Sequence, residues 1–350
     1  MIRLRLLLAC AALALPGATS AQPLLGARAI EHRFQDWRLV CDNVRVCRTQ
    51  VTGFAEGAGS LMIRRDPGPG GAILVMLDGQ QPNDGPYISD IWSIRVDGSG
   101  TWSGWRMDRE NHAAVVEGAQ ALAFVRRIAS ARTITYRAGA GTLSVSLAGL
   151  AAALRAMDEV QGRTGTVTAG VNPGRRRAAA VPAAAQVPIH LVPRVPAAAV
   201  PRGFAAAVRR THAAALRRAD CEDGVPGDDA VYPLSRTELL VLLRCRLYST
   251  GAGALLLRAP RASPGRAQVV ILPRQPGEDG VGDDGVYPDL EWDPRAVTLY
   301  ASAHSCAGTC GFVTHWTFDG RNFLLARHMT YEAGGGEPLD HYRTRIRIRR

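Results

Sequence analysis

The sequence predicts an α+β protein that is mainly antiparallel β, with two β-rich domains and a few helices. Short segments rich in β-branched and aromatic residues alternate with turns rich in Gly, Pro, Asn and Asp along most of the 350 residues. Residues 171–203 break this pattern: they have no periodicity, and Pro, Ala and Arg dominate. We therefore expect an extended, semi-rigid linker there, between an N-terminal domain (30–170) and a C-terminal domain (204–350).

The first residues, `MIRLRLLLACAALALPGATSAQP`, predict a secretory signal peptide over residues 1–21. Arg3 and Arg5 precede a short apolar run, and small residues lead up to Ala21. The run is too short for a membrane span, and no later segment reaches about 18 uninterrupted apolar residues. We expect the mature chain to be exported, to the periplasm or beyond the cell, with no transmembrane segment.

The N-terminal domain is predicted as an antiparallel β array closed by one helix. The expected strands are 34–41, 60–65, 72–77, 91–96, 121–128, 133–138 and 142–147. The helix is expected at 147–161, because Leu147, Leu150, Leu154 and Met157 form one apolar stripe at spacings of three and four residues.

The C-terminal domain is predicted to begin with two helices, at 204–221 and 235–245. Ser235 would be the N-cap of the second helix, with Glu238 completing a capping box. Strands are expected at 253–259, 267–273, 296–303, 311–318 and 322–329. Residues 342–349 alternate Arg with Tyr, Thr and Ile, which predicts a half-buried edge strand whose Arg face discourages pairing with other chains.

The basic charge is unevenly distributed. All 42 basic residues are Arg, and the formal net charge is +11. A GC-rich genome that rarely uses Lys codons explains this usage, so the high charge does not indicate a nucleic-acid partner. Residues 171–219 hold nine Arg and no Asp or Glu. Such a run is usually solvated; the other interpretation is contact with an anionic envelope component or another envelope protein.

Cysteine usage favours disulfides. Of the seven cysteines, Cys10 falls in the signal peptide, which leaves an even number in an oxidising compartment. Among the possible pairings, local spacing favours three pairs: Cys41–Cys47, Cys221–Cys245 and Cys306–Cys310.

Four segments resemble the bacterial domain of unknown function family 1176: `FQDWRLVCDNVRVCR` (34–48), residues 146–169, the `VP…P…VP` linker and `THWTFDGRNFLLA` (314–326). The resemblance implies an exported protein of a Gram-negative bacterium, without an implied activity. The first half is also similar to the invasion-associated locus B proteins. The second half departs from the family pattern at `RLYST` after Cys245, and `GTCG` (308–311) has an additional Cys306 nearby while a downstream Cys is absent. Relative to the family, we infer that Cys310 has exchanged a distant partner for Cys306.

Two acidic stretches, Asp223–Asp229 and Asp279–Asp284, are similar to each other and both run into Val-Tyr-Pro. Neither has the alternating carboxylates of an EF-hand, so surface loops are favoured over calcium sites. The segment `HSCAGTCGFVTH` carries His304, Cys306, Cys310 and His315. These side chains could bind zinc, but a Cys306–Cys310 disulfide competes and is favoured.

The densest polar cluster is Asp158, Gln161 and Arg163 at the end of the predicted helix. A structural role is favoured over ligand binding. With the cysteines paired and no nucleophile-elbow, Walker or dinucleotide motif present, we predict no catalytic, cofactor or metal residue. The leading interpretation is an exported, disulfide-stabilised, non-catalytic binding or envelope-associated module. The alternatives are a metal-dependent or other hydrolase using the His304/His315 corner or the Asp158 cluster, and a periplasmic inhibitor or ligand sensor.

Overall fold

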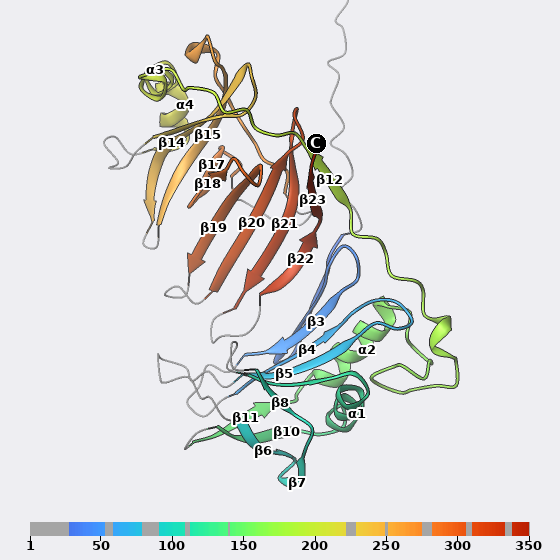
Figure 1. Ribbon diagram of the computed structural model, residues 1–350. Coiled ribbons are helices and arrows are strands. Elements are labelled where there is room, and N and C mark those ends of the chain that lie inside the picture. The colour runs from blue at the N-terminus through green and yellow to red at the C-terminus, as the bar shows by residue number, and fades with distance from the viewer. Residues whose placement is uncertain are drawn as a thin grey trace, which may run out of the picture.

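The structure is a computed structural model, shown in Figure 1. It describes residues 28–52, 59–78, 91–108, 113–138, 141–221, 229–248, 251–274, 282–305, 310–332 and 338–349. The predicted signal peptide lies outside the described residues. The prediction of a mainly antiparallel β protein with a few helices is confirmed.

The first half of the molecule contains two antiparallel sheets and two helices, in the lower part of Figure 1. The larger sheet has the order β1 (Ile30–Phe34), β2 (Trp37–Cys41), β3 (Cys47–Val51), β4 (Ser60–Arg65), β5 (Ile73–Asp78), β9 (Ala113–Glu117) and β8 (Arg106–Asp108). The smaller sheet has the order β11 (Gly141–Ser146), β10 (Thr133–Ala138), β6 (Ile91–Val96) and β7 (Ser99–Trp102). The helices are α1 (Gly118–Ile128) and α2 (Leu150–Val160).

Both sheets and both helices share one hydrophobic core. Helix α1 packs on β5 and β9, and α2 packs on β1, β2 and β3. Trp37 of β2 and Tyr136 of β10 are fully buried in this core. Gly149, just before α2, lies so close to β1 that a Cβ there would be 1.9 Å from the Phe34 carbonyl oxygen. This close approach fixes the start of α2 against the sheet.

Two strand predictions in the first half are wrong in detail. Residues 121–128 belong to α1, because Ala121, Phe124, Val125 and Ile128 form a buried helical stripe rather than an alternating face. The expected strand 34–41 is a hairpin that turns at Gln35 and Asp36, between β1 and β2.

The second half contains two further antiparallel sheets, in the upper part of Figure 1. One has the order β13 (Ala230–Pro233), β14 (Glu238–Tyr248), β15 (Gly251–Pro260) and β16 (Gln268–Val269), with β17 (Val286–Pro288) also paired to β15. The other has the order β18 (Glu291–Asp293), β19 (Thr298–Ser305), β20 (Cys310–Phe318), β21 (Phe323–Tyr331) and β22 (Leu339–Arg343). The helices are α3 (Phe204–Thr211) and α4 (Ala213–Arg218), and a short 3₁₀ turn covers Pro264–Arg266.

The predicted helix at 235–245 is wrong, because this segment begins β14. Leu239, Val241 and Leu243 pack in the core beneath α3 and α4, whereas Leu240 and Leu242 pack in the core shared with β19 and β20. A strand that is buried on both faces has a continuous apolar sequence. Periodicity cannot distinguish such a sequence from that of a buried helix. Ser235 does not cap a helix: its hydroxyl accepts hydrogen bonds from the N–H groups of Thr237 and Glu238.

Three other elements of the second half differ from their predictions. The helix expected at 204–221 is divided into α3 and α4 at His212. The strand expected at 267–273 is reduced to the two residues of β16. Residues 342–349 form the end of β22 and a separate strand β23 (Arg345–Ile348), and all four β23 residues are exposed, so the half-buried prediction is wrong there.

The segment predicted as a linker is extended and lies against the protein. It contains a 3₁₀ turn at Ala178–Ala180 and a strand β12 (Ile189–Val192) that pairs in parallel with β23. Val181 and Val192 are buried. Figure 1 shows the segment passing from the α2 region of the first half up to β12, beside β23. Among the helices of the described residues, none has the length and apolar character that crossing a membrane requires.

Candidate functional site

The cluster that the sequence singled out at the end of α2 is assembled in the structure, and we call Asp158, Gln161 and Arg163 the anchor. Asp158 is buried, and its carboxylate accepts hydrogen bonds from the N–H groups of Gly170 (2.9 Å) and Val171 (3.1 Å). Burial raises the pKa of Asp158, while these two N–H groups and nearby arginines act in the opposite direction.

Gln161 and Arg163 complete the anchor. The Gln161 side-chain amide donates to the carbonyl oxygens of Arg45 (2.8 Å) and Arg65 (2.9 Å). Its own oxygen accepts from Arg163 Nε at 2.9 Å. The Arg163 side chain has no exposed surface, and its guanidinium also donates to the Asp66 and Gly68 carbonyl oxygens and to the Thr168 hydroxyl.

The anchor therefore fixes the chain that leaves α2. It joins residues 158–171 to the loop after β2 and to the end of β4, and its polar groups are bonded to the protein itself. The following chain is held as well: a Cβ on Gly162, which has a φ of +68°, would lie 2.7 Å from Pro182. This arrangement supports the structural interpretation of the cluster.

The His304/His315 corner is not assembled as a metal site. His315 is opposite Tyr300 in the β19–β20 ladder, whereas His304 is opposite Gly311. The two positions are four residues apart along β19, which is about 13 Å along a strand. Two zinc-bound imidazole nitrogens lie within about 4 Å of each other. His304 instead contacts the Tyr331 hydroxyl at 2.5 Å. Burial and the charge of Arg327 lower the pKa of His315 to about 4.

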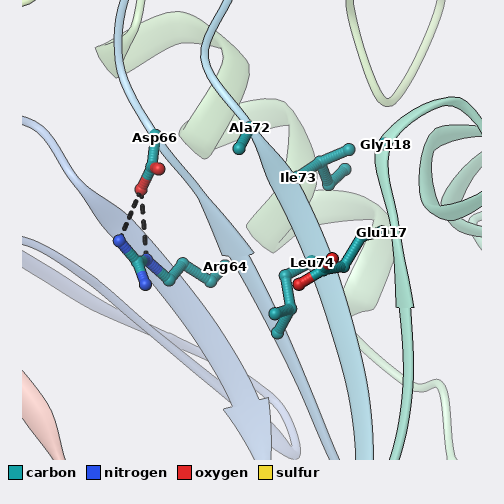
Figure 2. Close-up of a pocket in the computed structure, with 7 residues that line it drawn as sticks. All are labelled: Arg64, Asp66, Ala72, Ile73, Leu74, Glu117 and Gly118. Atoms are coloured by element: carbon teal, nitrogen blue, oxygen red, sulfur yellow. Dashed lines mark hydrogen bonds and ion pairs between the residues drawn. The ribbon is translucent and has the colours of Figure 1, made fainter. Parts of the chain in front are cut away.

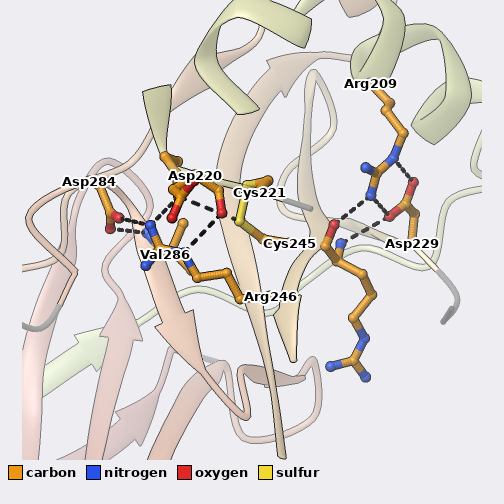
Figure 3. The surroundings of a disulfide bond; sticks show 10 residues. Arg209, Asp220, Cys221, Asp229, Cys245, Arg246, Asp284 and Val286 are labelled. Carbon is orange, nitrogen blue, oxygen red and sulfur yellow. Dashed lines mark hydrogen bonds and ion pairs between the residues drawn. A yellow bond between two sulfur atoms is a disulfide. The ribbon is translucent and has the colours of Figure 1, made fainter. Parts of the chain in front are cut away.

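The cysteines form covalent links. Cys41–Cys47 joins the facing ends of β2 and β3. Cys221–Cys245 joins the residues after α4 to β14 (Figure 3). Cys310 is also disulfide-bonded. Cys306, its predicted partner, lies outside the described residues.

The described parts of the acidic stretches are bound to arginines. Asp229 forms an ion pair with Arg209 of α3 (Figure 3). Asp229 also accepts a hydrogen bond from the Arg244 N–H at 3.0 Å. Asp284 pairs with Arg246 at 2.9 Å, and Asp283 pairs with Arg274. Asp223, Asp228 and Asp279 lie outside the described residues. Arg209 belongs to the basic segment 171–219, so this ion pair joins one acidic stretch to that segment.

A second buried polar cluster, which sequence reasoning missed, joins the two halves; we call it the seam. Its members are Asp42 and Asn43 from the first half and His328, Asp340, His341 and Arg343 from the second. Asn43 Nδ2 donates to the Arg343 carbonyl oxygen (3.1 Å), and Asn43 Oδ1 accepts the Arg343 N–H (2.9 Å). The Arg343 guanidinium forms ion pairs with Asp42 and, at 3.2 Å, with Asp340.

Asp42 has no exposed surface. Burial raises its pKa, and the positive charge of Arg343 and two backbone N–H groups oppose that shift. Arg38 adds a second bridge between the halves, since it contacts Glu31 (2.7 Å) in the first half and the Thr330 hydroxyl (3.1 Å) in the second.

The histidines of the seam are buried and close together, with ring centroids 5.3 Å apart. His328 contacts the Thr314 hydroxyl and His341 contacts the Thr330 hydroxyl, each at 2.8 Å. Burial, with the charges of His341 and Arg38, lowers the pKa of His328 to about 3. Burial also lowers the pKa of His341 to about 4, against the attraction of Glu31. Both rings are neutral near pH 7.

A shallow pocket of about 200 Å³ lies between β4, β5 and the start of α1 (Figure 2). Arg64 and Asp66 form an ion pair on one side, and Glu117 lies on the other with Leu74. Small-molecule sites are commonly about 300–1,000 Å³ and enclosed. The pocket is smaller than that range, and its arginine is already occupied by Asp66.

The sequence offered one signal for the seam. The polar pair Asp42 and Asn43 directly follows β2, and a buried polar group requires a partner. That partner is about 300 residues away in the chain, so local spacing could not identify it.

These features define a class: a disulfide-stabilised, mainly antiparallel β protein whose two halves are joined by a buried polar seam. The chain belongs to the family described as "Protein of unknown function (DUF1176)", whose model matches residues 31–336.

A relative, the "Uncharacterized protein YpfG" of Escherichia coli (strain K12), is 24% identical over 318 residues, which cover 87% of this chain and 89% of the relative. No solved structure matches the chain. The similarity of the first half to invasion-associated locus B proteins stays a prediction.

Proposed function

We propose that the mature protein is a periplasmic, non-catalytic module that binds another component of the cell envelope. The observation that carries this proposal is the pair of disulfides, Cys41–Cys47 in the first half and Cys221–Cys245 in the second. Stable structural disulfides belong to oxidising compartments, and the first 21 residues have the pattern of an export signal.

The hydrogen bonds and the positions of the candidate catalytic side chains support a non-catalytic role. The hydrogen bonds of the anchor residues are made to backbone groups and among the side chains themselves, as the contacts of Asp158, Gln161 and Arg163 show. His304 and His315 lie on different positions of β19 and β20 and face different tyrosines. A hydrolase would need such groups to converge on one accessible point.

Export and thiol state can be tested together in a Gram-negative host. The chain with its first 21 residues and a chain that begins at Gln22 are expressed, fractionated and alkylated without reductant. We expect the full chain in the periplasmic fraction with no alkylated cysteine, and the shortened chain in the cytoplasm with alkylated cysteines. A full chain that stays cytoplasmic would contradict export.

Metal analysis of the purified periplasmic protein tests the non-catalytic part of the proposal. We expect zinc well below one equivalent. One equivalent of zinc together with two alkylated cysteines would replace the proposal with the metal-dependent alternative.

A further inference from the structure

The parallel pairing of β12 with β23 creates a two-stranded ribbon whose two faces differ. The register places Ile189 beside Arg345 and Leu191 beside Arg347. Since side chains alternate along each strand, these four residues share one face, which we call the ribbon face. On the other face, Val192 is buried in the core of the second half and His190 contacts the Thr317 hydroxyl at 3.1 Å, while Ile346 and Ile348 of β23 are 40% and 38% exposed.

The ribbon face combines exposed aliphatic and cationic side chains. Ile189 and Leu191 are 48% and 47% exposed, among the most exposed large hydrophobic residues in the described part of the chain. Arg345 and Arg347 are exposed as well, and neither guanidinium forms an ion pair with a described residue. The carboxylate of Asp319 acts electrostatically on His190, and His190 lies on the opposite face of the ribbon from Arg345 and Arg347.

Some arginines elsewhere in the described chain are neutralised by carboxylates, although others, such as Arg127 and Arg175, also form no ion pair with a described residue. Arg209, Arg246, Arg258, Arg327 and Arg343 all form ion pairs with carboxylates. The ribbon face is distinguished by the combination: Arg345 and Arg347, without an ion-pair partner among the described residues, lie directly beside the exposed side chains of Ile189 and Leu191.

We propose that the ribbon face docks on an anionic phospholipid bilayer. The charge complementarity is direct: Arg345 and Arg347 meet lipid phosphates, while Ile189 and Leu191 enter the boundary between headgroups and acyl chains. The apolar stems of the arginines lie along the same boundary with their charged ends at the phosphates. This proposal deepens the proposed function, since export would bring the protein to envelope membranes.

The test uses purified chain from Gln22 to Arg350, with its disulfides intact, and co-sedimentation with vesicles. One set of vesicles is phosphatidylcholine, and the other contains phosphatidylglycerol in addition. We expect binding to the second set and little to the first, with affinity that falls as salt rises. Because it needs no cell, this measurement can succeed or fail independently of the export experiment.

Two variant pairs locate the binding surface. The double change Arg345→Gln with Arg347→Gln should weaken binding about thirtyfold, because each arginine near an anionic surface strengthens binding about fivefold. Ile189→Ser with Leu191→Ser should weaken it about tenfold. All four side chains are exposed, so unchanged thermal unfolding should confirm that the variants are folded.

Matched control variants remove the same kinds of side chain, two arginines or two aliphatic residues, from other parts of the surface. Arg175→Gln with Arg177→Gln removes two exposed charges from the basic segment, and Leu247→Ser with Ile271→Ser removes two exposed aliphatic groups. Binding should change less than threefold in both. Equal losses in ribbon and control variants would overturn the proposal, because binding would then follow net charge or general hydrophobicity.

Two further results would also overturn it. One is absence of binding to phosphatidylglycerol vesicles at low salt. The other is a concentration-dependent dimer in sedimentation velocity that the ribbon variants abolish, since a second copy would then be the occupant of the ribbon face.

Discussion

The anchor and the seam are both buried polar clusters, but they satisfy their charges in different ways. In the anchor, Arg163 and Asp158 are bonded mainly to backbone groups of the first half. In the seam, Arg343 lies between two carboxylates, and neutral histidines lie nearby. The anchor belongs to one half of the molecule, whereas the seam exists only where the halves meet.

This difference shows how polar burial can serve two purposes. Backbone carbonyl and N–H groups do not titrate, so the anchor has a single titrating acid, Asp158, and the raised pKa of that carboxyl gives no loss of stability on acidification. A cluster of carboxylates and imidazoles depends on protonation. We therefore expect the anchor to determine whether the first half folds, and the seam to determine how firmly the halves hold together.

The largest expected effect comes from the anchor. Arg163→Ala removes a fully buried guanidinium and leaves the Gln161 side-chain oxygen and the Asp66 and Gly68 carbonyl oxygens without that donor. We expect the free energy of unfolding to fall by about 3–5 kcal/mol, measured by urea unfolding of the disulfide-intact protein.

Arg127→Ala is the control for this change, because Arg127 is exposed on α1. Its effect should be within about 0.5 kcal/mol. Arg163→Lys should be intermediate, since an ammonium keeps the charge but cannot reproduce the planar fork of donors. If the urea-unfolding curves of Arg163→Ala and Arg127→Ala have similar midpoints and slopes, the anchor does not stabilise the first half.

The sequence predicted the anchor because its three residues lie within six positions of one another at a helix end. It also predicted β4, β5, β6, β10 and β11 of the first half, and in β10 and β11 one face is buried and the alternation is visible. It did not predict β3, β7, β8 or β9. It mispredicted β14 because that strand is buried on both faces. It missed the seam because Asn43 and Arg343 meet only after both halves have folded.

The next effect comes from removing the cation of the seam. Arg343→Ala leaves Asp42, which has no exposed surface, without its ion-pair partner. We expect a loss of about 2–3 kcal/mol in the free energy of unfolding, less than for a fully buried pair because the Arg343 side chain is 25% exposed.

A double-mutant cycle with Asp42→Asn separates this pair from its surroundings. The coupling energy should be about 0.5–3 kcal/mol, as for groups in direct contact. Strictly additive losses would mean that the two side chains act independently, and the ion pair would then have no role in the seam.

Acidification should weaken the seam without weakening the anchor. The pKa of His341 falls from 6.5 to about 4 in the folded protein, so the unfolded chain binds more protons below pH 6.5. The stabilisation is complete above pH 6.5 and is lost as the pH falls toward 4. Asp42 acts in the opposite direction, because its raised pKa makes its protonation easier in the folded protein.

For His341 alone we expect a loss of about 1–2 kcal/mol between pH 7 and pH 5. The groups that face the two rings are Glu31, Arg38 and Asp340, and all are present in the His341→Gln variant. That variant should show a flatter pH dependence of the unfolding free energy. An unchanged slope would show that His341 does not contribute to the pH dependence in this range.

The smallest effect is expected at the ion pair of Arg64 and Asp66, where the two side chains are 36% and 32% exposed. Arg64→Ala should change the free energy of unfolding by less than about 1 kcal/mol, and added salt should reduce the difference further. Asp66 sharpens the comparison with the anchor, because its carboxylate serves this exposed pair while its backbone oxygen accepts from Arg163. Asp66→Asn keeps that backbone hydrogen bond, so its free energy of unfolding, measured with urea, should be close to that of Arg64→Ala. A loss near that of Arg163→Ala would mean that the exposed carboxylate, and not the backbone, supports the anchor.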